Sequence, residues 1–351
     1  MIRLRLIGDV VFTTPAIGAL RRRFPTARLT YLVEAAAEPV VRHHPDLDEV
    51  VVVDRPRGLA RIRYDLQLAK RLRAERFDVV IDFHGGPRSG FLTWTSGAPE
   101  RIGYALPGRQ LSYTTRVRWS RTLVPPRHSV LNQWDLIAPL GIGPPTGVAD
   151  PVVMPVTADA AARVATRLAA AGVADTAPIV VLHVSAGNPF RRWPTAAFAE
   201  VAARLAEEHR ARRIIITSGP SEADAAEAVA AQARALAGPA GDGIVRTGEF
   251  DLAELRALVG RAALYIGGDS GPLHIAATTS TPVVALFGPT LPERSMPWRD
   301  PAVGSIAVDA GPLPCRPCHQ RHCVPGDFRC LTGISPTMVL DAARTLLPHH
   351  P

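Results

Sequence analysis

The chain has 351 residues, of which 47% are hydrophobic, so it holds enough apolar material for two domains and is not one small module. No apolar run approaches the roughly 18 residues of a membrane span, and no signal peptide is recognisable at the amino terminus. We therefore expect a cytoplasmic protein. Its four cysteines all lie between Cys315 and Cys330, which excludes a disulfide-stabilised scaffold.

The net charge of +8 comes entirely from the first half of the chain. Residues 1–150 contain 22 Lys and Arg residues against 14 Asp and Glu residues, whereas the rest of the chain is balanced. Lys70 is the only lysine, so guanidinium groups carry nearly all of this charge, and these suit bidentate contact with phosphate or carboxylate. The excess predicts an anionic partner, either a nucleic acid or an acidic substrate at a membrane surface. Alternatively, it forms a solvated basic face.

The first half alternates short β-branched runs with helical patterns, which predicts a parallel sheet with crossover helices. The expected strands cover residues 29–33, 49–53 and 78–83. One helix is expected at 15–24, with Thr14 as its N-cap and Pro15 at its first position. An Arg-rich helix is expected near 62–75, and the glycines and prolines of 141–155 indicate an interdomain linker.

The second half repeats this alternation, which predicts a second domain of the same kind. The expected strands cover residues 179–183, 213–217, 263–266 and 282–287. The expected helices cover residues 198–205, 222–236, 252–259 and 336–347. Two such domains in tandem should leave a cleft between them, because open parallel sheets bind ligands at the carboxyl ends of their strands.

The strongest motif is the segment 267–274, in which two glycines end a strand and a helix begins almost at once. Free backbone amides and the helix dipole then point at whatever lies over the turn, which favours a phosphate. Asp269 can accept hydrogen bonds from sugar hydroxyls, and His274 can donate to a phosphate oxygen. Alternatively, Asp269 or Ser270 only caps the helix and His274 packs in the core.

Two further strand ends carry candidate donor groups. Small residues at 185–187 follow a strand and leave amides free, and Arg191 could neutralise a leaving diphosphate. Glu222 would place a carboxylate where a ribose diol binds, or it is a favourable first-turn acid. Neither turn is a dinucleotide-binding or P-loop motif, which disfavours a dehydrogenase or a P-loop NTPase.

Asp9 follows the first apolar stretch and precedes the helix at 15–24, so its carboxylate would project into the cleft. A carboxylate there could deprotonate an attacking hydroxyl as a general base. The alternative is an acid that stabilises a helix start.

Together these segments resemble glycosyltransferase family 9, the heptosyltransferases of lipopolysaccharide core synthesis. The motifs that carry the resemblance are the Gly8–Asp9 loop leading to Thr14 and Pro15, and the segments 191–194, 269–274 and 287–290. The resemblance covers essentially the whole chain, including residues 101–104 and the terminal helix.

The resemblance implies an α/β protein of GT-B fold, two Rossmann-like domains facing each other across a cleft. Residues 1–150 would bind the acceptor, residues 151–334 an ADP-sugar, and residues 335–351 would form a helix and tail. It also implies a metal-independent, inverting transfer of heptose in which Asp9 matches the catalytic base.

By the same resemblance, Arg191 matches a phosphate-binding lysine, Glu222 a ribose contact, and Asp269 and His274 the contacts to donor sugar and diphosphate. The expected donor-binding residues are Ser185, Ala186, Gly187, Arg191, Glu222, Asp269, Ser270, Gly271 and His274. The expected acceptor-binding residues are Arg61, Arg63, His84 and Arg101.

The sequence departs from the family at three places. The family normally has several more residues before the equivalent of Arg3 and Leu4, so we expect the start codon to lie upstream. Arginine replaces lysine at position 191, which keeps the charge but changes the hydrogen-bond geometry. The cysteine-rich segment occurs in only part of the family.

That segment has the spacing C-x2-C-x4-C-x6-C, formed by Cys315, Cys318, Cys323 and Cys330. Four thiolates could hold a structural zinc ion, and the first spacing matches common zinc knuckles. The later spacings are loose, and we favour free or transiently paired thiols in a reducing cytoplasm.

We therefore expect an inverting glycosyltransferase that moves heptose from ADP-heptose to a lipopolysaccharide core acceptor of the Kdo/heptose-lipid A type, with no required cofactor. Its partners would be the nucleotide sugar and an anionic glycolipid at the inner face of the inner membrane, and we expect a monomer that binds no nucleic acid. The alternatives are another GT-B nucleotide-sugar transferase or a sugar epimerase. A basic nucleic-acid-binding protein is the non-enzymatic alternative, although the basic half lacks aromatic interleaving or a recognisable module.

Overall fold

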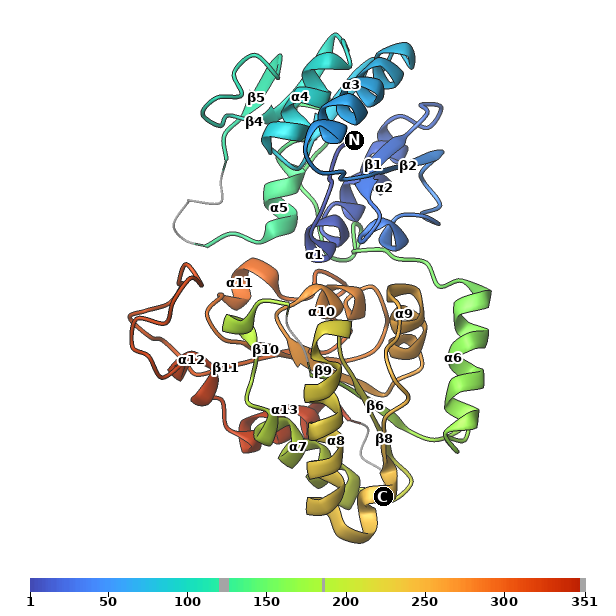
Figure 1. The fold of residues 1–351 in the computed structure, drawn as a ribbon, viewed down its shortest axis with the longest axis vertical. Coiled ribbons are helices and arrows are strands. Elements are labelled where there is room, and N and C mark those ends of the chain that lie inside the picture. The colour runs from blue at the N-terminus through green and yellow to red at the C-terminus, as the bar shows by residue number, and fades with distance from the viewer. Residues whose placement is uncertain (120–125, 185–186, 348–351) are drawn as a thin grey trace. The chain divides into compact units, whose positions relative to one another are not determined.

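The computed structural model describes residues 1–119, 126–184 and 187–347. It separates into two compact units, Met1–Pro155 and Val156–Pro351, each an α/β unit with parallel strands (Figure 1). The division falls at the end of the Gly- and Pro-rich segment 141–155. Within the described ranges, no helix is both long and apolar enough to cross a membrane.

The first unit is built on parallel strands that fall into two groups. The strands are β1 (Thr30–Glu34), β2 (Glu49–Val53), β3 (Val79–Asp82), β4 (Glu100–Tyr104) and β5 (Thr115–Val117). β1 pairs with β2, and β3, β4 and β5 pair in that order. Ile2 forms parallel bridges to both Leu32 of β1 and Asp82 of β3, so the chain start lies between the groups and links them into one layer.

Helices cover both faces of this layer. They are α1 (Ile7–Val11), α2 (Thr14–Arg23), α3 (Leu59–Ala74), α4 (Pro87–Thr95) and α5 (Ser129–Trp134). Leu68 and Leu72 of α3 join one core with β1 and β2, whereas Leu20 of α2 and Trp134 of α5 join another core beside β3 and β4.

The expected cap of α2 is wrong by one residue. Thr13, not Thr14, occupies the N-cap position, and it makes no side-chain capping hydrogen bond. Thr14 is the first helical residue, and its hydroxyl donates to the Val11 carbonyl at 2.8 Å. Pro15 is therefore the second residue, where its missing amide hydrogen is still tolerated.

The second unit holds one six-stranded parallel sheet in the order β11-β10-β9-β6-β7-β8. Its strands are β6 (Ile179–His183), β7 (Arg213–Thr217), β8 (Ile244–Val245), β9 (Leu264–Gly268), β10 (Val283–Phe287) and β11 (Ser305–Asp309). Alternate residues of the strands β6 to β10 enter different cores: in β6, Val180 and Leu182 face one, Ile179 and Val181 the other. Both faces of the sheet are thus buried, as continuous apolar strands require.

The helices that bury these faces are α6 (Ala158–Ala170), α7 (Thr195–Glu208), α8 (Ala223–Ala237), α9 (Leu252–Gly260), α10 (Gly271–Ala276) and α13 (Pro336–Leu346). Side chains of α7, α8 and α13 pack into one core, and those of α6, α9 and α10 into the other. Two single turns, α11 (Pro292–Ser295) and α12 (Arg329–Thr332), complete the helices.

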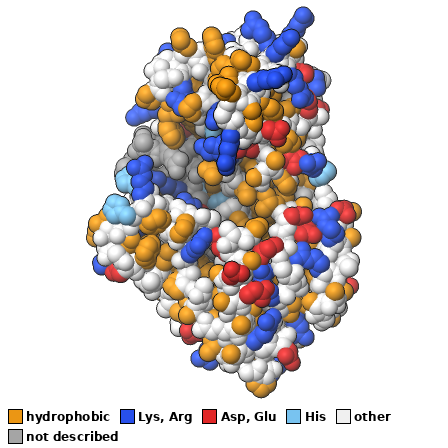
Figure 2. Space-filling model, viewed as in Figure 1, with side chains coloured by type: hydrophobic (Ala, Val, Ile, Leu, Met, Phe, Trp, Pro, Cys, Tyr) orange, Lys and Arg blue, Asp and Glu red, His pale blue; other side chains and the backbone are white. Residues whose placement is uncertain are grey.

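The surface of the first unit carries its excess charge beside apolar side chains. Figure 2 shows basic and hydrophobic side chains next to one another on the part of this unit that holds α3 and α4. Leu59, Ile62 and Leu66 of α3 and Trp94 of α4 are all exposed.

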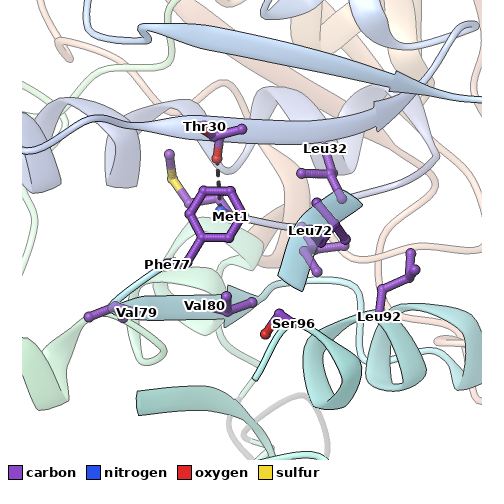
Figure 3. Close-up of a pocket in the computed structure, with 10 residues that line it drawn as sticks. Met1, Thr30, Leu32, Leu72, Phe77, Val79, Val80, Leu92 and Ser96 are labelled. Atoms are coloured by element: carbon purple, nitrogen blue, oxygen red, sulfur yellow. Dashed lines mark hydrogen bonds between the residues drawn. The ribbon is translucent and has the colours of Figure 1, made fainter. Parts of the chain in front are cut away.

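A small apolar pocket lies among Met1, Thr30, Leu72 and Phe77 of the first unit, where the terminal ammonium donates to the Thr30 carbonyl at 2.9 Å (Figure 3). Thr30 begins β1 and Val79, which also lines the pocket, begins β3. The pocket is therefore at the amino-terminal end of the strands, opposite the end at which parallel α/β sheets bind ligands.

Candidate functional site

The second unit has a topological switch point between β6 and β9. After β6 the chain adds β7 and β8 on one side of the sheet, and β9 then pairs with the other side of β6. Parallel sheets bind ligands outside the carboxyl ends of the strands at such a point. Arg191 follows β6, Asp269 follows β9 and Thr290 follows β10, so all three come from strand ends at this edge.

Asp269 lies at the centre of this group and is almost completely buried. The Thr290 hydroxyl donates to its carboxylate at 2.6 Å, Arg191 Nη1 donates at 3.0 Å, and His274 Nε2 lies 3.6 Å away. Burial by itself would raise the pKa of Asp269, but the hydrogen bond and charge of His274, the Arg191 guanidinium and the Thr290 hydroxyl outweigh it and lower this pKa to about 2. Asp269 is therefore ionised at neutral pH.

Arg191 is held from two sides. Its Nη1 also donates to the Asp269 backbone carbonyl at 3.1 Å, and its Nε donates to Gln320 Oε1 at 2.7 Å. The same Gln320 oxygen accepts from the Asn188 amide at 2.8 Å. Sequence reasoning missed Gln320, because it lies 129 residues from Arg191 and no local motif marks it.

Gly267 and Ser270, on the two sides of Asp269, have different roles. A Cβ at Gly267 would lie 2.6 Å from the Tyr265 hydroxyl, so packing within the sheet alone requires that glycine. α10 starts at Gly271, and Ser270 in its N-cap position makes no side-chain capping bond. Among the described residues, the buried Ser270 hydroxyl has no hydrogen-bond partner. The alternative of simple capping by Asp269 or Ser270 therefore has no support in the hydrogen bonds.

Glu222 is buried at the end of the turn Pro220–Glu222, one residue before α8 starts. Its carboxylate accepts from Arg192 Nη2 at 2.5 Å and from the Ser221 hydroxyl at 2.8 Å. The neighbouring Trp193 fixes this arginine turn, since its buried indole N–H donates to the Ile334 carbonyl at 3.0 Å. Ser185 and Ala186 lie outside the described residues, and Gly187 is the first residue described after them.

Asp9 lies in the short helix α1, which sequence reasoning treated as a loop. Leu6 connects the chain start, which lies between β1 and β3, to this helix. Its φ of 68° is a backbone conformation that leucine rarely adopts. The Asp9 carboxylate forms an ion pair with Arg3 Nη2, and Arg3 Nη1 donates to the Phe83 carbonyl at 2.6 Å. Arg3 is largely buried and therefore fixes Asp9 beside the carboxyl end of β3.

His84 lies in the loop directly after β3, near the charges of Arg3 and Asp9. Burial lowers its pKa to about 4, helped by the cations Arg3, Arg5 and Arg55 and opposed by Asp9. The imidazole is therefore neutral at pH 7. Arg5 and Arg55 are exposed and add positive charge near this histidine, which suits an anionic ligand.

Buried Asp82 holds this loop in place. It accepts from the Tyr113 hydroxyl at 2.7 Å and from the backbone amides of His84 and Gly85 at 2.9 and 3.0 Å. Burial raises the pKa of Asp82 in spite of these hydrogen bonds. Its role is structural, since both of its carboxylate oxygens accept these hydrogen bonds.

The structure brings only part of the expected acceptor set together. His84 lies near Asp9, whereas Arg61 lies 3.7 Å from Asp65 on α3 and Arg63 is exposed on the same helix. Arg101 is at the amino-terminal end of β4 and donates to the carbonyls of Ala98 at 2.6 Å and Ser112 at 3.1 Å. Arg5 and Arg55, which act on His84, were missed, although Arg55 lies shortly after the end of β2.

The four cysteines are free thiols in the described structure, with Cys330 buried. Burial, together with the neighbouring Cys318 and Cys315, raises the pKa of the Cys330 thiol. Within the described ranges, no group of three or more His, Cys, Asp or Glu residues could hold a metal ion.

Comparison with known proteins gives the same family by several routes. Residues 66–326 match the model of glycosyltransferase family 9 (heptosyltransferase). The chain is 28% identical over 351 residues to lipopolysaccharide heptosyltransferase 3 of Escherichia coli K12, covering 98% of this chain and 96% of that protein. It is 24% identical over 336 residues to lipopolysaccharide heptosyltransferase 1 of Pseudomonas aeruginosa, covering 92% and 86%.

Solved structures establish the fold. A glycosyltransferase family 9 protein of Veillonella parvula superposes with a TM-score of 0.81 at 23% identity, covering 98% of this chain and 95% of the other. The E. coli heptosyltransferase WaaC with ADP superposes with a TM-score of 0.72 at 17% identity, covering 98% of both chains. The α/β class and GT-B fold expected from the sequence are confirmed.

Proposed function

Because the chain belongs to glycosyltransferase family 9, we propose that it moves heptose from ADP-heptose to a phosphorylated lipopolysaccharide core acceptor. The relatives named as lipopolysaccharide heptosyltransferases support the sugar and the acceptor class. The observation that carries the proposal is the group at the switch point of the second unit, where Arg191, Asp269 and Thr290 meet at the carboxyl ends of three strands.

The donor would bind at this group. Arg191 contributes a guanidinium that can turn from Asp269 to the diphosphate, and the Ser270 hydroxyl offers a donor without a protein partner among the described residues. Ionised Asp269 accepts from heptose hydroxyls, and His274 donates beside it. Glu222 takes the ribose diol, while Arg192 holds its carboxylate in place. Ser185, Ala186, Gly187 and Gly271 complete the proposed donor set through backbone amides.

The transfer is a single displacement with inversion. Asp9 takes the proton of the acceptor hydroxyl as that oxygen forms a bond to the anomeric carbon. The bond between this carbon and the diphosphate oxygen breaks, and ADP leaves with the electron pair, its charge stabilised by Arg191. Arg3 orients the Asp9 carboxylate throughout, because its other nitrogen is fixed on the Phe83 carbonyl.

The acceptor is proposed to bind the first unit. Arg5 and Arg55 supply positive charge near His84 and Asp9 that suits a phosphorylated core oligosaccharide. Arg61, Arg63 and Arg101 remain candidates from the sequence. We propose a cytoplasmic monomer that meets its acceptor at the inner face of the inner membrane and needs no cofactor.

Product analysis tests the proposal. The protein is incubated with ADP-heptose and a truncated core acceptor, and the acceptor mass is expected to rise by one heptose while ADP is released. An epimerase would instead change the nucleotide sugar without any acceptor. Thermal shifts with ADP, UDP and GDP form the second arm, and a larger shift with UDP or GDP would contradict the assigned donor.

A further inference from the structure

The solvent side of α3 carries a stripe of large apolar side chains that the fold leaves uncovered. Leu59, Ile62 and Leu66 are 83%, 58% and 58% exposed. Their spacing of three and four residues places them on one face of the helix. The opposite face already supplies the core through Leu68 and Leu72, so this second apolar face, the α3 stripe, serves no packing within the described chain.

Cations flank the α3 stripe. The segment 55–76 contains eight basic and two acidic residues. Both acids are engaged, since Asp65 pairs with buried Arg88 at 2.6 Å and Glu75 lies 3.3 Å from Arg28. The flanking cations Arg63, Lys70 and Arg73 are exposed, and none of them forms an ion pair within the described residues. Figure 2 shows the same mixture of basic and apolar side chains over this region.

We propose that the α3 stripe and its flanking cations dock on an anionic phospholipid bilayer. The apolar side chains would enter the boundary between headgroups and acyl chains, while the long basic side chains reach back to the lipid phosphates. Anionic lipid attracts each nearby Lys or Arg within about a Debye length. A nucleic acid would satisfy the cations but leave Leu59, Ile62 and Leu66 in water.

A second copy of the chain fits this face poorly. In a symmetric dimer the same patch meets itself, so the cations Arg63, Lys70 and Arg73 would face an equally basic patch. The two acids of the segment are already paired and could not offset that repulsion. A bilayer rich in phosphate groups supplies the missing negative charge.

The position of α3 gives the docking a purpose. The helix starts at Leu59, a few residues after β2 ends, so its first turn lies at the carboxyl edge of the strands. Arg55 lies in the connection between β2 and α3, and its charge contributes to the lowered pKa of His84. Asp9 also acts on His84, so Asp9 and His84 lie near that same edge. Docking would bring the bilayer to the edge where a lipid-linked acceptor is needed. This purpose rests on the proposed function, but the docking itself does not.

Sedimentation with vesicles tests the proposal. The full chain is mixed with vesicles of phosphatidylglycerol and phosphatidylethanolamine, or of phosphatidylcholine alone, and is expected to sediment with the anionic ones. Replacing Leu59, Ile62 and Leu66 by Asn should lower the binding about tenfold or more. Replacing Arg63, Lys70 and Arg73 by Gln should lower it up to about fivefold per residue at low salt.

A matched variant controls for general loss of surface hydrophobicity. Val148 and Leu236 are 65% and 53% exposed outside α3, and replacing both by Asn should leave vesicle binding unchanged. Circular dichroism and ADP binding confirm that each variant is folded. Unchanged sedimentation of the Asn triple variant would overturn the proposal. The proposal would also fail if the wild type does not bind vesicles but forms a dimer that this variant abolishes. Vesicle binding without heptose transfer would instead leave the docking intact and refute the proposed function.

Discussion

Both units place polar groups at the carboxyl ends of parallel strands, but they assemble them differently. In the second unit, Asp269 contacts His274 in the helix that follows it and Thr290, which lies 21 residues further along the chain. In the first unit, Asp9 depends on Arg3, which is anchored on the Phe83 carbonyl 80 residues away. The contact of Asp269 with His274 shows in the sequence as one motif, whereas contacts between distant segments, such as Arg191 with Asp269 or Arg3 with Phe83, show only as isolated residues.

The largest expected effect tests the assignment of Asp9. Asp9→Asn keeps the shape of the side chain but removes the base, so turnover should fall about 10²-fold or more. ADP affinity should not change, because the donor group belongs to the second unit. Steady-state kinetics and calorimetry with ADP measure the two quantities.

Asp175→Asn serves as the matched control, since among the described residues this exposed carboxylate pairs with Arg261 alone, and its replacement should leave both quantities unchanged. Near-normal turnover of Asp9→Asn would return Asp9 to a structural role in α1.

The fold was predictable where strands are apolar on both faces. β6, β9 and β10 are continuous apolar runs, because helices cover both sides of the sheet. β4 and β5 were missed, since their sequences ERIGY and TRV carry charged residues on partly exposed positions. β11 and the Ala-rich α6 were also missed, the first because it is an edge strand with a half-exposed pattern.

The site was predictable where the interacting residues lie close together in the sequence. Asp269 and His274 stand in one motif, and the structure brings them within 3.6 Å. Gln320 and Arg3 were not recognisable, because their partners come from elements that only tertiary packing brings near. Gly267 was read as a phosphate-loop glycine, but the Tyr265 hydroxyl alone excludes any larger residue there.

The second prediction concerns the clamp on Arg191. Arg191→Ala removes a charged hydrogen-bond donor from the diphosphate site and should weaken ADP binding about 10- to 100-fold. Gln320→Ala removes one of the contacts that position Arg191, together with the hydrogen bond from Asn188, and should weaken ADP binding about threefold, because the bond to Asp269 remains. Calorimetry measures both. Equal losses would show that Gln320 itself contacts the nucleotide, and no loss in either variant would remove the donor from this site.

The third prediction is a pH dependence of stability from Asp269. Its pKa is about 2 in the folded chain, below the ordinary value of 3.8, so below about pH 4 the unfolded chain binds the proton more readily than the folded one. The ionised carboxylate should contribute about 2 kcal/mol of stability above pH 4, and this is lost as the pH falls towards 2. Urea unfolding of wild type and Asp269→Asn over this range measures it. Parallel pH profiles of the two proteins would show that Asp269 does not carry the effect.

A last, modest effect decides how the basic charge of the first unit acts. Arg61→Gln with Arg63→Gln should raise the acceptor KM about fivefold at low salt when the acceptor is embedded in anionic vesicles, because cations near such a surface act only within a Debye length. The effect stays small because Arg61 already lies 3.7 Å from Asp65. ADP affinity should stay constant, and Arg204→Gln in the second unit, which removes an exposed arginine paired with Glu207, should change neither quantity. With a delipidated core acceptor free in solution, the double variant should have a normal KM if these arginines serve the bilayer. An equal rise in KM with that soluble acceptor would place them in contact with the oligosaccharide itself and would reduce α3 docking to its apolar stripe.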